Sequence, residues 1–229
     1  MSDDLEVTYR FRLPRQAQPV EVALQFEPEH FEMRLPRGHA PAAPWTDLVF
    51  NQCPNCPLSE DEASACPAAA RLAGIVPQFE QVVSYDELSV EVETPERRVV
   101  AATSVQQALS SLIGLVMASS GCPRTRFFRL MARFHLPLAT EEETVLRVLG
   151  TYASQAVVAG EGGEAAPLDL AGLFDLYREL RVVNQAMTRR LSAAVKADST
   201  LNAVVILDIF AMAVPAAIED AFGPLRSLL

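Results

Sequence analysis

The chain has 229 residues, of which 50% are hydrophobic and 21% are charged, so it has enough apolar residues for a sizeable core and is not globally disordered. Its formal charge of −10 repels phosphate backbones, which argues against general nucleic-acid binding. The acidic start lacks the basic and apolar regions of a signal peptide. The longest apolar run, residues 203–218, carries Asp208 and Pro215 and is shorter than the roughly 20 residues of a membrane span. We therefore expect a cytoplasmic protein with no membrane partner.

Alternation of apolar and polar residues predicts strands near the start of the chain. Residues 5–13 and 20–26 alternate with a period of two, and residues 31–35 repeat the pattern over a shorter length. The brief connections between them favour an antiparallel meander. Further strands are predicted within residues 45–50, 88–92 and 98–101. Residues 1–103 are therefore expected to form one antiparallel sheet of five or six strands.

From residue 104 the pattern becomes helical. Ser104 with Gln107, and Thr140 with Glu143, have the form of capping boxes that start helices. After a glycine-rich break at 160–165, residues 170–194 place apolar side chains at alternating spacings of three and four. This stripe is either a coiled-coil seam, with Asn184 fixing the register, or the core of an intramolecular bundle, which we favour.

The last helix, from about residue 200, is apolar over most of its circumference, and we expect it to be buried for much of its length. The predicted fold is therefore α+β. Residues 1–103 form the sheet region, residues 104–229 form an α-helical bundle, and the two make one globular unit.

All four cysteines are followed by proline: Cys53, Cys56, Cys66 and Cys122. Cys53 and Cys56 form a Cys-x-x-Cys pair, which is typical of a knuckle that gives two thiolates to one metal. Proline is favoured at the first position of a helix, so Cys66 and Cys122 are expected at N-caps, where free amides lower the thiol pKa. We therefore predict one four-cysteine metal site that joins the sheet to the bundle.

The spacing leaves the metal open. Cysteine followed by proline resembles ligand segments of iron–sulfur proteins, including the cluster-closing dipeptide of bacterial ferredoxins, and this resemblance implies a [4Fe–4S] cluster. Zinc is the alternative, although its sites usually use two paired knuckles. Without a metal, the thiols would lie in the core or form a disulfide pair. Cys53-Pro-Asn-Cys56 also resembles the redox dithiol of thioredoxin-fold proteins, but Pro57 interrupts the helix expected after it.

A basic stripe follows Cys122. Arg126, Arg129 and Arg133 share one helix face and are candidates for binding a small anionic ligand or an acidic partner protein. Ion pairs with the acidic residues 141–143 are the simpler alternative. His135 lies in an apolar setting, where it is an alternative metal ligand, a proton donor, or a structural histidine bonded to the backbone.

Segments 50–58, 119–123 and 131–143 resemble an uncharacterised bacterial protein family with Cys-Pro motifs, which implies no known activity. From the residues we expect a soluble metalloprotein, monomer or homodimer, that uses its four-cysteine site for structure or electron transfer rather than substrate turnover. One alternative is a metal-dependent enzyme with a pocket near His135, Arg126 and Arg129. Another is an adaptor that binds a partner through its C-terminal helices.

Overall fold

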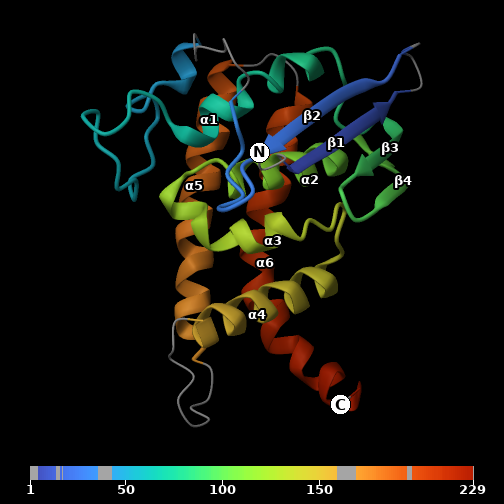
Figure 1. Ribbon diagram of the computed structural model, residues 1–229, viewed down its shortest axis with the longest axis vertical. Coiled ribbons are helices and arrows are strands. Elements are labelled where there is room, and N and C mark those ends of the chain that lie inside the picture. The colour runs from blue at the N-terminus through green and yellow to red at the C-terminus, as the bar shows by residue number, and fades with distance from the viewer. Residues whose placement is uncertain are drawn as a thin grey trace.

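The computed structural model describes residues 5–13, 16, 18–35, 43–158, 169–194 and 198–228, with the backbone alone for residues 219 and 221–228. Within these ranges the four strands of an antiparallel sheet lie in the first 104 residues, with short helical elements between the second and third strands, and the longer helices follow (Figure 1). The α+β class is therefore confirmed. The glycine-rich break predicted at 160–165 lies outside the described residues.

The described sheet has four strands, not the five or six predicted. The strands are β1 (Leu5–Arg12), β2 (Val20–Phe26), β3 (Glu87–Glu93) and β4 (Arg98–Ser104). They lie in the order β2-β1-β3-β4, and every neighbouring pair is antiparallel. Tyr9 in β1 is opposite Val22 on one side and Val92 on the other, and all three are buried. One face of the sheet thus contributes to the core, as the period-two alternation indicates.

Two of the predicted strands, 31–35 and 45–50, are not strands in the structure. Phe31 has φ 50°, in the left-handed region, so the chain turns there, and Met33 forms only an isolated bridge with Phe26. Residues Pro44–Thr46 form a short 3-10 helix, η1, with proline at its start. Phe31, Met33 and Leu48 are nevertheless buried. The apolar pattern in these segments therefore indicated burial rather than a strand.

The helical elements occupy most of the remaining chain. They are α1 (Pro67–Leu72), η2 (Val76–Phe79), α2 (Val105–Ala118), η3 (Pro123–Phe128), α3 (Arg129–Arg133), α4 (Glu141–Val158), α5 (Ala171–Ala194) and α6 (Asp198–Leu228). α5 and α6 are long neighbours, α2 packs against α6 near the sheet, and α4 crosses α6 farther from it (Figure 1).

The predicted capping boxes have different outcomes. At the start of α4, the Thr140 N–H donates to Glu143 Oε2 at 2.8 Å and the Glu143 N–H donates to Thr140 Oγ1 at 3.2 Å. This box is confirmed. At the start of α2, the Ser104 side chain makes no capping bond, and Gln107 instead accepts from Thr103 Oγ1 at 2.6 Å.

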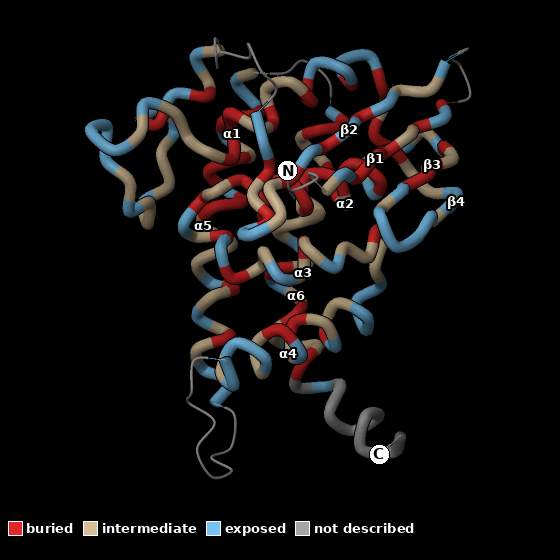
Figure 2. The backbone as a smooth tube through the Cα atoms, in the orientation of Figure 1, coloured by how far each residue is buried: buried red, intermediate tan, exposed pale blue. Residues whose placement is uncertain are grey.

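Two groups of buried side chains form the core. The larger lies between the sheet, α1, α2 and parts of α5 and α6, and the smaller lies where α4, α5 and α6 meet (Figure 2). Tyr177 belongs to the smaller group, while Met187 and Leu191 belong to the larger. The apolar stripe of α5 therefore packs within its own chain, as the bundle interpretation predicts.

Among the described helices, α6 alone is long and apolar enough to cross a membrane, over Asp198–Ile218. Only 28% of the 18-residue apolar stretch of this helix is buried, and Val205, Ile209 and Met212 are exposed. The expectation that the last helix is buried for much of its length is therefore wrong. Core helices can have the same length and composition, and α6 does pack against α2, α4 and α5. The cytoplasmic location stays a prediction.

Candidate functional site

The structure brings the four cysteines to one small cavity of about 20 Å³, enough for about one water molecule. Cys53 and Cys56 come from the loop between η1 and α1, and Cys66 and Cys122 are the N-cap residues of α1 and η3. A proline follows each N-cap cysteine at the first helical turn, as predicted. Val183 and Met187 of α5 close the cavity on the side of the bundle.

The metalloprotein function predicted from the sequence is wrong. In the part of the chain that the structure describes, no group of three or more His, Cys, Asp or Glu side chains is arranged to hold a metal ion. All four cysteines are free thiols. The alternative of a metal-dependent enzyme is wrong for the same reason. The identity of the cofactor, a [4Fe–4S] cluster or zinc, was a prediction that no feature of this geometry tests.

For Cys53 and Cys122, burial has the largest effect on the pKa of the thiol. Burial raises the pKa of Cys53 to about 12, and the neighbouring thiols of Cys66, Cys122 and Cys56 add to this effect. Burial also raises the pKa of Cys122, although the backbone N–H groups of Arg124 and Thr125 act in the opposite direction. The expected easy ionisation is therefore wrong for Cys122, because loss of water outweighs the helix amides.

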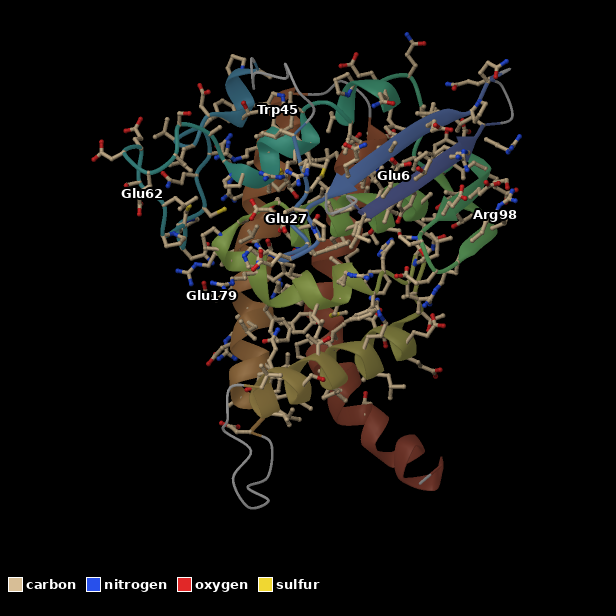
Figure 3. The ribbon with its side chains drawn as sticks, in the orientation of Figure 1. Glu6, Glu27, Trp45, Glu62, Arg98 and Glu179 are labelled. Carbon is tan, nitrogen blue, oxygen red and sulfur yellow. The ribbon has the colours of Figure 1, made fainter. Side chains whose placement is uncertain are left out.

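Arg190, which was not predicted from the sequence as a site residue, lines this cavity and is hydrogen-bonded to the chain before the Cys-x-x-Cys loop. Arg190 is 1% exposed, and its guanidinium donates to the carbonyl oxygens of Trp45, Asp47 and Leu48, each at 2.7 Å. Trp45 lies beside the C-terminal end of α5 (Figure 3). A signal was present in the sequence, because residue 190 lies three positions after Met187 on the apolar face of α5.

The loop that carries Cys53 and Cys56 is also tied to α5 and η3. Asn55 Nδ2 donates to Glu179 Oε2 at 2.6 Å and to the Glu179 carbonyl oxygen at 3.1 Å. Arg124 Nε donates to the Asn55 carbonyl oxygen at 2.5 Å, and its guanidinium lies 3.4 Å from the Glu179 carboxylate. Figure 3 shows Glu179 on α5, on the side of the molecule where the loop with Glu62 projects.

Two arginines of the predicted basic stripe are engaged in ion pairs. Arg129 lies 3.8 Å from the Glu32 carboxylate, and Arg133 lies 3.1 Å from that of Glu96. Among the described ion pairs, none joins these arginines to residues 141–143, so the expected partners were wrong. Arg126 is exposed. Binding of an anionic ligand or an acidic protein by the stripe stays a prediction.

A second, far larger cavity lies between β4, α2, α3, α4, α5 and α6. Its volume is about 580 Å³, and apolar side chains provide most of its surface. Among the larger ones are Leu115, Met117, Phe128, Leu180, Leu207 and Phe210. A few polar residues also line it, among them Ser111, His135, Arg147, Tyr177 and Asn184.

His135 lies at this cavity, and the hydrogen bond described for its ring is to a side chain. Its Nε2 is 2.5 Å from the hydroxyl of Tyr9, which is also 2.9 Å from Ser111 Oγ. Ser111 Oγ in turn accepts from the Leu138 N–H at 3.2 Å. Burial lowers the pKa of His135 to about 3, and the positive charge of Arg147 acts in the same direction. His135 is therefore a neutral imidazole at physiological pH.

The α5 wall of the cavity carries an unpaired polar group. Asn184 is 1% exposed, and its Nδ2 has no hydrogen-bond partner among the described residues. Tyr177, two turns earlier on α5, is buried, and burial raises the pKa of its hydroxyl. Arg147 of α4 donates to the carbonyl oxygens of Met131 and Phe134 at 2.7 and 3.1 Å. The cavity thus combines an apolar lining with a few hydrogen-bonding groups and one positive charge.

The fold and its cavities define a small α+β protein whose helices line a mainly apolar pocket beside an antiparallel sheet. The chain belongs to a domain family of unknown function, DUF6901, whose model matches residues 7–229. This match agrees with the resemblance to an uncharacterised family, whose bacterial origin stays a prediction. No curated protein and no solved structure matches the chain.

Proposed function

We propose that this protein binds a small, mainly apolar molecule in the cavity between α2, α4, α5 and α6. The observation that carries the proposal is the cavity itself. Its volume of about 580 Å³ falls within the range of about 300–1,000 Å³ for small-molecule sites. Such sites are lined mostly by apolar side chains with a few placed polar groups, and this cavity has that composition.

The polar groups indicate what one end of the ligand carries. A buried amide donor without a partner is unfavourable by about 1–3 kcal/mol, so Asn184 favours a ligand with a hydrogen-bond acceptor such as a carbonyl or carboxylate oxygen. The positive charge of Arg147 disfavours a cationic ligand. His135 is neutral and adds a hydrogen-bonding group without a charge.

Two helical glycines provide a matched test. Gly114 lines the cavity, and a Cβ added there would lie 3.3 Å from Leu207 Cδ2, whereas a Cβ at Gly150 would meet nothing within 4 Å. Each Gly→Leu change raises helix propensity by a similar amount, up to about 1 kcal/mol, so stability should change alike apart from the fit at residue 114.

The assay is a titration with a medium-chain fatty acid and with an uncharged apolar fluorophore. We expect wild type and Gly150→Leu to bind with equal affinity, and Gly114→Leu to bind at least about tenfold more weakly, which is about 1.4 kcal/mol. Far-UV circular dichroism checks that both variants are folded. Equal binding by Gly114→Leu and Gly150→Leu, or no binding of either probe by wild type, would refute the proposal.

A further inference from the structure

The four thiols form a second place in the molecule where chemistry is possible, separate from the apolar cavity. All four cysteines of the chain line the same 20 Å³ cavity, although they come from three segments of the sequence. Cys53, Cys56 and Cys66 are partly exposed, while Cys122 is buried. Free thiols that meet at an accessible position can be oxidised to disulfides.

Cys53 and Cys56 are held close together by the backbone. The Cys56 N–H donates to the Cys53 carbonyl oxygen at 2.9 Å, which closes a four-residue turn over Pro54 and Asn55. Such a turn keeps the two Cα atoms within about 7 Å. Disulfides span Cα separations of about 4.4–6.8 Å, so this pair can be bridged with little backbone movement. Both residues also line the same cavity.

We propose that this cluster is a thiol oxidation site, in which Cys53 and Cys56 form a reversible disulfide on reaction with a peroxide. Neither metal nor the apolar ligand is involved, so the proposal does not depend on the function proposed above. The Cys-x-x-Cys pair is thus the reactive dithiol, and its co-reactant is a hydroperoxide.

The reaction begins at Cys56. The Cys53 thiol is kept protonated by burial and by its neighbours, so it is the poorer nucleophile, whereas Cys56 is partly exposed. Cys56 loses its thiol proton and its sulfur attacks one peroxide oxygen; the O–O bond breaks, the sulfur becomes a sulfenic acid, and the departing hydroxide takes up the proton as one water. Cys53 sulfur then attacks the Cys56 sulfur and loses its proton, and the hydroxyl group leaves as a second water. Two thiols and one peroxide thus give one disulfide and two waters.

The surrounding contacts favour pairing within the turn. Asn55 lies between the two cysteines and is anchored to Glu179 and Arg124, so the turn is held in place on α5 and η3. Cys122 is 9% exposed and is therefore shielded from a peroxide in solution. Cys66 lines the same cavity but comes from the N-cap of α1, so it is not held to Cys56 by a shared turn as Cys53 is. We expect both to remain thiols when the first disulfide forms.

The experiment uses the reduced full-length chain and an equimolar to tenfold excess of hydrogen peroxide. Free thiols are counted after unfolding, and the remaining ones are alkylated before cleavage by a glutamate-specific protease without reductant. Cleavage at Glu60 and Glu62 separates the fragment with Cys53 and Cys56 from the fragment with Cys66. Mass spectrometry of wild type locates the disulfide, so this readout does not depend on any variant folding.

We expect the thiol count to fall from four to two, with the Cys53–Cys56 fragment unalkylated and lighter by two hydrogens, and dithiothreitol to restore all four. Cys56→Ser should prevent this disulfide, whereas Cys122→Ser, the control, should still form it. A first disulfide joining other cysteines, stepwise oxidation to sulfinic acid without a disulfide, or four thiols that resist the peroxide would each overturn the proposal.

Discussion

His135 gives a prediction whose size follows from the structure. Its pKa is about 3 in the folded protein because of burial, against about 6.5 for an unperturbed histidine. Between these values the unfolded chain binds a proton that the folded chain does not, so this histidine lowers stability as pH falls from about 6.5 towards 3. At pH 5 the difference amounts to about 2 kcal/mol at most, and because His135 is only partly buried we expect about 1–2 kcal/mol.

The perturbation is His135→Gln, which removes the titrating group while the glutamine side chain can still bond the hydroxyl of Tyr9. His30→Gln, at an exposed turn, is the matched control. Free energies of unfolding are measured by urea titration at pH 7 and pH 5 for wild type and both variants. The carboxylates of Glu27 and Glu62 have lowered pKa values and also destabilise the fold as pH falls, and both are present in all three proteins. The backbone N–H groups of His30 and Glu29, which lower the pKa of Glu27 most, are kept in His30→Gln, and the charge of His30 contributes less.

The change between pH 7 and pH 5 isolates the histidine. We expect wild type and His30→Gln to lose the same amount of stability, and His135→Gln to lose about 1–2 kcal/mol less. If His135→Gln follows the wild-type pH dependence within the error of about 0.3 kcal/mol, the imidazole is not buried neutral and the reasoning is refuted.

Three further changes test the fold around the cavities. Arg190→Met leaves three buried carbonyl oxygens without their donor and should lower the free energy of unfolding by about 3–5 kcal/mol, measured in urea. Gly121→Ala should lower it by about 1–2 kcal/mol, because Gly121 has φ 82° and an added Cβ would collide with the Glu32 carboxylate; full stability of this variant would contradict that geometry. Thr140→Ala removes the capping hydroxyl bonded to the Glu143 N–H and should lower the free energy of unfolding by about 1 kcal/mol, whereas Thr140→Ser should keep the wild-type value.

Local patterns in the sequence predicted local structure well. The alternation in residues 5–13 became β1, and the threonine–glutamate pair at residues 140 and 143 formed its capping box. Proline after Cys66 and Cys122 placed both at N-caps. These features depend on neighbours a few residues away, so the sequence contains nearly all the information that determines them.

Features that depend on several distant elements could not be predicted in the same way. The large cavity is the space left between five helices and a strand, and its existence depends on how their side chains fill that space. The prediction that Cys122 ionises easily was wrong because a helix end is visible in the sequence, whereas burial depends on distant segments such as α5. The prediction of strands at 31–35 and 45–50 was wrong because alternating burial does not require a segment to pair with a neighbouring strand, as Phe31 and Met33 show.

The Arg190 contacts also determine when the fold around the cysteines can be completed during synthesis. The carbonyl oxygens that bind this guanidinium lie 142 to 145 positions earlier in the sequence. At about 5–20 residues per second, a ribosome needs roughly 7–30 s to cover that distance. During this interval the segment before the Cys-x-x-Cys loop has left the ribosome while its anchor has not yet been made. The thiols are thus more accessible on the nascent chain than in the fold, because α5, which lines one side of their cavity, is made after the other segments that line it.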